Sequence, residues 1–295
     1  MKFGTYTFPC DDLPMEERLT RIRDVGYDYV ALSFFPELAD HVRHCEKIGL
    51  PIENVHLKCN GTSKLWLDDD SGEAIVDFYC EQIRICSELG LKIGIAHTTW
   101  GKQIAPPNPR GFARYERIVE CAEKYGFTLA VENTKSREHL TAIMDHFDSP
   151  CVKFCWDVGH QIGYDPEAPF IEKYGEKLCA LHIHDTKAGS DLHIAPLDGA
   201  GDWNEVAKQL ASTSYGREKL TAEPGGRIHS VKEGLSAETI RARYASLAEV
   251  DNEKILRFYD GYYTCFEDMS FDEIAAYYLE RMKTLAAMVE KEAKA

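Results

Sequence analysis

Hydrophobic and polar positions along the chain follow two alternating patterns. Short, mostly apolar runs without a helical period predict buried strands. Between them lie longer stretches whose apolar residues recur three and four positions apart, which predicts amphipathic helices. Strands are expected at 3–8, 27–34, 52–58, 91–99, 127–134, 152–158, 178–185 and 218–224. Helices are expected at 15–26, 37–49, 71–90, 111–126, 137–147, 168–177 and 203–213.

The order of these elements predicts the fold class. Near-continuous apolar strands that alternate with amphipathic helices indicate a parallel sheet covered by helices. Several of the helices end in glycine just before the next strand, which is a common C-terminal stop signal. Eight such units favour an α/β fold of the closed (β/α)8 TIM-barrel type over an open sheet.

The length of 295 residues suits one barrel with an addition. We expect a single domain over residues 1–295, with the barrel at about 1–235 and a helical extension at about 236–295. The extension ends in an amphipathic helix that begins at Phe271. Two roles for the extension stay open, a cap over the barrel mouth or a contact within a homo-oligomer such as a dimer or tetramer.

Composition narrows the classes of partner. The formal net charge is −15, which argues against a nucleic acid as the main partner because nucleic-acid binders carry basic patches. The chain has no apolar run of membrane-spanning length, and its first residues do not resemble a signal peptide. The ten cysteines are scattered without a C-x-x-C pair, so we expect reduced, buried thiols in a cytoplasmic protein.

The polar residues at the predicted strand ends are of a restricted kind. Six consecutive strands, the third to the eighth, end in Glu, Asp or His after an apolar first half. In chain order these residues are His56, His97, Glu132, Asp157 with His160, the trio His182, His184 and Asp185, and Glu223. The carboxyl ends of the strands form the active site of such a barrel. Ordinary loops would also bring Ser, Gly, Asn and Lys to these positions, so the series indicates a metal site.

The mixture of carboxylates and imidazoles points to a divalent metal ion. Such ligands suit Mn²⁺, Co²⁺, Zn²⁺ or Fe²⁺, whereas Mg²⁺ prefers oxygen ligands alone. We expect Mn²⁺ first, with the other ions, Mg²⁺ included, left open. His182 and His184 are two residues apart on a strand, so both face the same way. One of them can be a ligand and the other a substrate contact or a packing residue.

Four segments together resemble the xylose isomerase-like TIM-barrel superfamily. They are VENT at 131–134, WDVGH at 156–160, LHIHDTKAGSDLHIAPLDGAGDW at 181–203 and AEPGG at 222–226. This superfamily includes sugar isomerases and epimerases, inosose-processing enzymes and nucleases of the endonuclease IV type. The resemblance, which covers roughly residues 1–225, implies one metal ion held as in ketose 3-epimerases, here by Glu132, Asp157, His184 and Glu223. It also implies that His160 contacts the hydroxyl groups of the substrate.

A second part of the resemblance leaves an alternative open. Asp191 and His193, with His160, match residues that hold a second metal ion in xylose isomerases and in the nucleases. His56 and His97 match two histidines that the nucleases use for a third metal ion. These matches imply a metal-dependent DNA-repair nuclease as the alternative function. The net charge of −15 would repel a polyanion, and no basic run lies near the strand ends, so sugar chemistry is favoured.

The resemblance implies an isomerase or epimerase acting on a small ketose, aldose or sugar derivative. The metal ion would polarise the carbonyl, and Glu132 and Glu223 would remove and return the adjacent carbon-bound proton through an enediolate. The same first step would serve a keto-inositol dehydratase or an enzyme that cleaves sugar conjugates by β-elimination. We expect substrate contacts from His160, His97, His56, His182 and Trp100. Tyr6, Phe8, Phe34, Trp66 and Trp100 form either an apolar wall for the sugar or ordinary packing.

Overall fold

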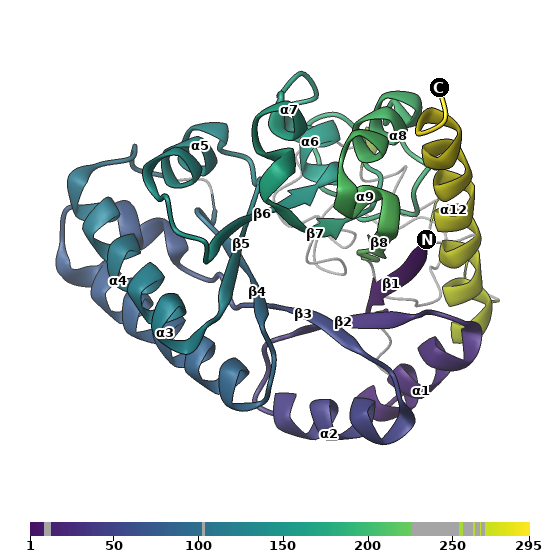
Figure 1. The fold of residues 1–295 in the computed structure, drawn as a ribbon, viewed down its shortest axis with the longest axis horizontal. Coiled ribbons are helices and arrows are strands. Elements are labelled where there is room, and N and C mark those ends of the chain that lie inside the picture. Colours follow the sequence, from purple (N-terminus) through teal and green to yellow (C-terminus); the bar gives the residue numbers. More distant parts are fainter. Residues whose placement is uncertain (9–12, 102–103, 226–253, 256–261, 263–265, 267–268) are drawn as a thin grey trace. The chain divides into compact units, whose positions relative to one another are not determined.

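The computed structural model describes residues 1–8, 13–101, 104–225, 254–255, 262, 266 and 269–295. Within them, eight parallel strands are hydrogen-bonded in the order β7-β6-β5-β4-β3-β2-β1-β8, with helices between successive strands (Figure 1). This confirms the predicted (β/α)8 TIM barrel. The strands are β1 Lys2–Tyr6, β2 Tyr29–Ser33, β3 Ile52–His56, β4 Ile93–His97, β5 Thr128–Glu132, β6 Val152–Asp157, β7 Leu178–His182 and β8 Lys219–Ala222.

The helices also agree with the sequence pattern. The α-helices are α1 Met15–Val25, α2 Leu38–Ile48, α3 Glu73–Glu88, α4 Pro109–Tyr125, α5 Arg137–His146, α6 Val158–Tyr164, α7 Phe170–Tyr174, α8 Trp203–Ser212, α9 Ser214–Glu218 and α12 Phe271–Glu292. Short 3₁₀ helices are η1 Thr62–Trp66, η2 Asp70–Gly72 and η3 Gly175–Lys177. Gly26, Gly49 and Gly126 follow α1, α2 and α4 with left-handed backbone angles, so the glycine stop signals are confirmed.

The sequence pattern missed two short helices, α6 and α9, and misplaced the strand ends. Helix α6 begins directly after Asp157 and carries His160, whereas the pattern gave only a strand end there. Two glycines in its seven residues weaken the helical signal. The strands end one to three residues earlier than predicted, so His184 lies beyond the end of β7. Ile183 still forms a parallel bridge with Ala222, which continues the pairing of that segment past the end of the strand.

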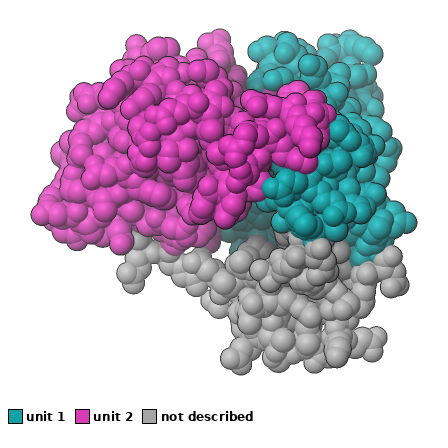
Figure 2. Space-filling view, turned by 90° about the horizontal axis from the view of Figure 1, so that it is seen from below, with its two compact units in different colours: residues 1–30, 158–166, 182–295 teal, residues 31–157, 167–181 magenta. Residues whose placement is uncertain are grey.

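The described residues divide into two compact units (Figure 2). Unit 1 consists of residues 1–30, 158–166 and 182–295, and unit 2 of residues 31–157 and 167–181. In unit 2, β3 to β6 pair in parallel and α3 packs against α4. Fully buried Ile95, Ala130, Cys155 and Ala180 form a layer of its core.

Unit 1 is held together by pairing of the first and last strands. β1 pairs in parallel with β8, from Lys2 opposite Lys219 to Thr5 opposite Ala222. Helix α12 packs against α1 and α8 and buries nine residues of its apolar face. It begins with a capping box, in which the Ser270 side chain accepts a hydrogen bond from the Glu273 amide and the Glu273 carboxylate accepts one from the Ser270 amide. The predicted C-terminal helix is confirmed, but most of the extension before it, 236–268, lies outside the described residues.

Two compositional expectations can be compared with the described residues. None of their helices is long and apolar enough to cross a membrane. The eight cysteines among them are free thiols, four of them buried and four partly buried, as the scattered spacing predicted. Burial raises the pKa of the Cys45 and Cys86 thiols to about 12, so these thiols stay protonated at neutral pH.

Candidate metal centre and active site

The strand ends of unit 2 bring two imidazoles to one buried carboxylate. His97 ends β4 and lies opposite Glu132, which ends β5, in the strand register. The Nε2 atom of His97 lies 3.1 Å from Glu132 Oε2, and His56 Nε2 lies 3.5 Å from the same oxygen. The two imidazoles meet edge to face with ring centres 4.9 Å apart. Their ligand atoms lie within 4.8 Å of one another, close enough to share a metal ion.

Burial and charge act in opposite directions on His97. Burial lowers its pKa, but the negative charge of Glu132, with a smaller contribution from Cys59, outweighs burial and raises the pKa to about 10. The Glu132 side chain is 1 % exposed, so little water screens this pair. Such a buried charged arrangement favours a cation, either a proton on the imidazole or a metal ion in its place.

The backbone of Asp157 is held by the side chain of Asn133. The Asn133 side chain donates to the Asp157 carbonyl at 2.7 Å and accepts from the Asp157 amide at 2.8 Å. Asn133 directly follows Glu132, so these two hydrogen bonds hold the ends of β5 and β6 in register. The Asp157 side chain is fully buried.

In unit 1, three imidazoles approach the carboxylate of Glu223. His182 Nδ1 lies 3.2 Å from Glu223 Oε2, His193 Nδ1 lies 3.6 Å from it and His184 Nε2 lies 3.9 Å from it. Both His182 and His184 reach this one oxygen, which agrees with the expectation that they face the same way. The His182 Nε2 atom forms a hydrogen bond with the Tyr6 hydroxyl at 3.1 Å.

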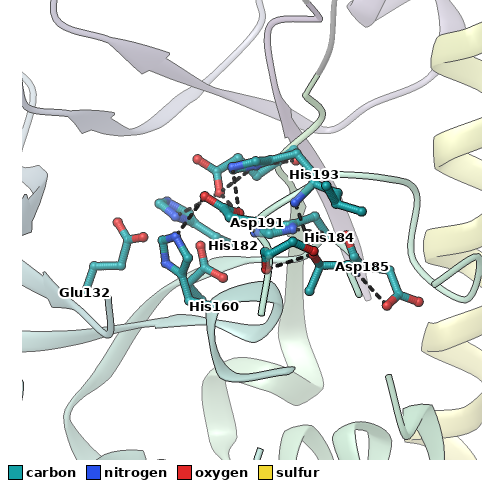
Figure 3. Close-up of polar contacts among 12 residues, drawn as sticks. Glu132, His160, His182, His184, Asp185, Asp191 and His193 are labelled. Atoms are coloured by element: carbon teal, nitrogen blue, oxygen red, sulfur yellow. Dashed lines mark hydrogen bonds and ion pairs between the residues drawn. The ribbon is translucent and has the colours of Figure 1, made fainter. Parts of the chain in front are cut away.

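Asp191 lies between the imidazoles of His160 and His193 (Figure 3). Its Oδ2 atom is 3.2 Å from His160 Nε2, and its Oδ1 atom is 3.1 Å from His193 Nε2. Burial raises the pKa of Asp191, but the charges of His193 and His160 outweigh burial and hold the pKa well below its usual range. The imidazole of His193 stacks on that of His184 with ring centres 4.0 Å apart. The predicted second group, His160, Asp191 and His193, is therefore brought together within this unit.

Gly159 explains how His160 and His184 come close. A Cβ atom at Gly159 would lie 1.9 Å from Cε1 of His184, so any other residue would displace that imidazole. Glycine therefore allows α6 to pack directly on the His184 ring. The need for glycine at position 159 of the WDVGH segment was not predicted from the sequence.

Asp185 has a role that the sequence did not assign. Its carboxylate is fully buried and accepts hydrogen bonds from the Trp203 indole at 2.6 Å and from the Thr186 amide at 2.8 Å. It also accepts from the three consecutive amides of residues 199–201. These bonds hold the whole segment between β7 and α8, which carries Asp191 and His193. The only hint in the sequence was the position of Asp185 directly after His184.

The aromatic residues predicted as a wall for the sugar divide into two kinds. Trp66 is fully buried, and its indole donates to the Thr98 carbonyl at 2.9 Å. Phe8 is 1 % exposed and packs against Phe271. For these two residues the structure agrees with ordinary packing, the second of the two alternatives. Trp100 is 48 % exposed and is free to contact a substrate.

The surroundings of two buried carboxylate oxygens, one of Asp191 and one of Glu223, indicate whether a cation fits the candidate site. Among the described residues, Asp191 Oδ1 and Glu223 Oε2 are buried without a hydrogen bond of ordinary geometry, although imidazoles lie near both. Such atoms carry a desolvation cost that a bound cation would offset. The donor atoms of His184, His193 and Glu223 also lie within 4.8 Å of one another. These residues therefore fit a divalent metal ion.

The four residues predicted to hold one metal ion are distributed over both units. Glu132 and Asp157 belong to unit 2, and His184 and Glu223 belong to unit 1. All four lie at or just beyond the C-terminal end of a strand. That they hold a single ion, and that Glu132 and Glu223 act as acid and base, stays a prediction.

Comparisons with known proteins place the chain in a family. The model of the family described as xylose isomerase-like TIM barrel matches residues 19–242, and the chain belongs to this family. An uncharacterized protein, y4fM, of Sinorhizobium fredii is 34% identical over 102 residues. That match spans 34% of this chain and 32% of the relative, so it reaches only about a third of the relative's length.

Two further comparisons extend over most of the chain. Fructoselysine 3-epimerase of Shigella flexneri is 22% identical over 243 residues, which cover 73% of this chain and 87% of that protein. A solved structure of L-ribulose 3-epimerase superposes with a TM-score of 0.71 at 15% identity and covers 100% of this chain and 97% of that one. At these identities the structural likeness concerns the fold.

Proposed function

We propose, from the membership of this chain in the xylose isomerase-like TIM barrel family, that it is a divalent-metal-dependent sugar isomerase or epimerase. The observation that carries this proposal is the set of buried carboxylates and imidazoles at the strand ends. Glu132 and Asp157 are at most 1 % exposed in unit 2, and Glu223 is approached by three imidazoles in unit 1. Buried carboxylates of this kind need a compensating cation.

In this proposal Glu132, Asp157, His184 and Glu223 hold the metal ion. The ion would polarise the substrate carbonyl and make the adjacent carbon-bound proton more acidic. Glu132 removes that proton, and Glu223 returns one to the opposite face of the carbon. His160 binds the hydroxyl groups of the sugar and holds it in place, whereas His182, which contacts Tyr6 and Glu223 through its two nitrogens, orients the Glu223 carboxylate. Because two bases act on opposite faces, the proposal favours epimerisation over isomerisation.

The substrate class is proposed from the relatives. Two proteins that match most of the chain are named fructoselysine 3-epimerase and L-ribulose 3-epimerase, and both names describe epimerisation next to a ketose carbonyl. We therefore propose a ketose, free or conjugated, as the substrate. Dehydration of a keto-inositol and β-elimination from a sugar conjugate share the first proton transfer. Product analysis separates them, because epimerisation conserves the mass of the sugar and elimination does not.

The test is incubation of the metal-loaded protein in D₂O with a panel of ketoses that includes fructoselysine. The expected result is deuterium at the carbon next to the carbonyl, read by mass spectrometry and NMR. Glu132→Gln should lower the exchange rate by about 10²–10⁴-fold, the usual contribution of a positioned base. Glu88→Gln is the matched control, because Glu88 lies on the outer surface of α3 in an exposed ion pair with Arg84. Exchange by Glu132→Gln at the wild-type rate would contradict the assigned role.

A second candidate, a metal-dependent nuclease, is favoured by one observation. His56 and His97 converge on Glu132, and Asp191 lies between His160 and His193, which is more imidazole than one metal ion needs. The net charge of −15 argues against a nucleic-acid substrate.

Elemental mass spectrometry and a nicking assay separate the two candidates. One metal ion per chain, lost in Asp157→Asn and kept in His193→Ala, supports the sugar enzyme. Two or three ions per chain, partly lost in His193→Ala, together with nicking of duplex DNA that carries an abasic site, would support the nuclease. A protein that binds no divalent metal ion under any reconstitution would contradict both.

A further inference from the structure

The segment between β7 and α8 holds two residues in a strained conformation. His193 and Leu197 have φ angles of 50° and 74°, in the left-handed region that residues other than glycine rarely adopt. Strain of this kind persists only where surrounding contacts impose it. We refer to residues 191–198 as the Asp191–Asp198 loop. It presents Asp191 and His193, so the contacts that hold it also set the positions of these two side chains.

Helix α12 supplies contacts at both strained positions. The Tyr278 hydroxyl donates to the His193 carbonyl at 3.2 Å. Asp198, next to Leu197, accepts a hydrogen bond from the Tyr277 hydroxyl at 2.6 Å and forms an ion pair with Arg281 at 2.6 Å. These three residues of α12 lie within two turns of the helix and belong, like the loop, to unit 1.

Helix α12 is itself firmly placed within that unit. Tyr278 is 1 % exposed, and its ring meets that of Phe8 edge to face at 5.2 Å. The helix packs on α1 and α8, and the capping box fixes its first turn. The position of the Tyr278 hydroxyl is therefore fixed, and its hydrogen bond can hold the backbone of the loop in place.

The held carbonyl belongs to the residue that carries the imidazole. The His193 carbonyl also accepts a hydrogen bond at 3.0 Å from the amide of Gly225, which is two residues after Glu223. The His193 ring stacks on His184 and approaches both Asp191 and Glu223. A shift of the His193 backbone would therefore move its ring away from several predicted cation ligands at once.

We propose that helix α12 is a positioning element for the candidate metal centre. Tyr278, with the Asp198–Tyr277–Arg281 cluster, holds the Asp191–Asp198 loop in its strained conformation and so fixes Asp191 and His193, which lie against the proposed ligands His184 and Glu223. This assigns a role to the C-terminal helix that the sequence left open. It rests on the proposed function only in naming His184 and Glu223 as ligands of a divalent cation.

The test compares two buried tyrosines at the packing interface of helix α12, one that contacts the Asp191–Asp198 loop and one that does not. Tyr278→Phe removes the hydroxyl that reaches His193. Tyr27→Phe is the matched control, because the Tyr27 hydroxyl is also buried and donates at 3.0 Å across the α12 interface, to the Ala275 carbonyl, without contacting the loop. Both variants lose one buried hydroxyl contact of α12, so a general loss of helix packing should affect them equally.

Two readouts are measured on the metal-free full chain. Hydrogen exchange followed by mass spectrometry reports the loop, and a Co²⁺ titration followed by visible absorption reports cation affinity and the imidazole ligand field. Tyr278→Phe should speed exchange in residues 191–198 and weaken Co²⁺ binding by about tenfold, the lower end for residues that orient ligands. Tyr27→Phe should leave both readouts within about twofold, because its contact lies away from the ligands.

The outcomes separate this inference from the proposed function. Equal effects of the two variants on loop exchange, or faster exchange in Tyr278→Phe with unchanged Co²⁺ affinity, would overturn the inference. A wild-type protein that binds no Co²⁺ would overturn the metal-dependent function, and the exchange data would then decide the positioning role alone. In that case faster loop exchange in Tyr278→Phe supports the role and unchanged exchange refutes it.

Discussion

At the scale of the residue, a short chain of contacts links Tyr6 to Glu223. The Tyr6 hydroxyl meets Nε2 of His182, and Nδ1 of the same ring meets the Glu223 carboxylate. His182 is fully buried, and the two rings meet edge to face with centres 5.1 Å apart. Both nitrogens of His182 are therefore engaged, which fixes the orientation of the ring toward Glu223.

Tyr6→Phe should lower the rate of the proposed proton exchange by about tenfold. The reason is that the Tyr6 hydroxyl orients His182, which contacts Glu223, without itself reacting with the substrate. The fold should be unchanged, as the ring remains. Tyr29→Phe is the control, because the Tyr29 hydroxyl is also buried and donates to the Leu220 carbonyl at 3.0 Å. Steady-state kinetics and circular dichroism check the prediction. Equal activities in the two variants would mean that the Tyr6 hydroxyl only stabilises the barrel.

His139, which lies outside the candidate site, is expected to make the stability of the folded protein depend on pH. Its Nε2 lies 2.8 Å from the Ala105 carbonyl and its Nδ1 lies 2.6 Å from the Ser136 hydroxyl. Burial lowers the pKa of His139 below the usual 6.5, and hydrogen bonding to Ala105 offsets burial only in part. The unfolded chain therefore binds a proton here more readily than the folded chain does. The contribution to stability is complete above about pH 6.5 and is lost as the pH falls below it.

Urea unfolding at pH 7.5 and pH 5.5 tests this sign. The wild-type protein should lose more stability between the two values than His139→Gln does, since the variant cannot take up the proton. His146→Gln, on the exposed end of the same helix α5, controls for the loss of one imidazole. A His139→Gln variant whose stability falls as steeply as that of the wild type would show that this residue does not titrate as described.

Single residues also show where sequence reading succeeds and where it stops. Glu132, Asp157 and Glu223 could be found because carboxylates after apolar strands are unusual and because barrel geometry brings strand ends to one side. The sequence did not predict that Tyr6 orients His182 or that Asp185 holds the segment between β7 and α8. The bonds of Tyr6 to His182 and of Asp185 to amides 14–16 residues away depend on tertiary neighbours that no local pattern records.

At the scale of the element, Arg114 joins helix α4 to the segment between β3 and α3. Its side chain is 2 % exposed, and its guanidinium donates to the carbonyls of Leu65 and Leu67 and to the Glu73 carboxylate. A Cβ atom at Gly72 would lie 2.6 Å from the guanidinium carbon, so glycine is required where the segment passes over it. One buried cation thus satisfies several carbonyls that have no helix or strand partner.

Arg114→Met should destabilise the protein by about 3 kcal/mol, because charge-assisted hydrogen bonds contribute about 1.5–3 kcal/mol each and buried carbonyls would lose their donor. Arg110→Met is the control, since Arg110 forms ion pairs with Asp68 and Asp70 at the surface and should cost under about 1 kcal/mol. Chemical denaturation measures both. Equal losses in the two variants would contradict the structural role of Arg114.

Elements were predicted well where periodicity is strong and poorly where it is absent. Apolar runs gave all eight strands, and the longer amphipathic stretches gave the long helices, because burial of one face leaves a repeat in the sequence. Helix α6 was missed because VGHQIGY is short and glycine-containing. Its glycines serve the close approach to His184 rather than helix formation. A local rule is broken there because tertiary contacts at the candidate site require it.

At the scale of the whole molecule, alternation of strands and helices and a family model that matches residues 19–242 lead to the same barrel. The negative charge then limits the chemistry. A formal net charge of −15 favours cations over polyanionic substrates at every surface that lacks local basic residues. The sequence could not predict what helix α12 does, because an amphipathic pattern reports that a face is buried and not which loop it contacts.

Removal of the proposed metal ion should lower the thermal stability of the whole protein. A ligand that binds only the folded state at a hundred times its Kd stabilises that state by about 2.7 kcal/mol. For a chain of this size we expect chelation to lower the Tm by about 5 °C, with re-addition of Mn²⁺ restoring it. Asp157→Asn supplies the comparison, because it lacks a predicted ligand and should unfold at the same temperature with and without chelator. If differential scanning calorimetry found the same chelator-induced drop in Asp157→Asn as in the wild type, the cation would be binding elsewhere, and the assignment of Asp157 as a ligand would have to be abandoned.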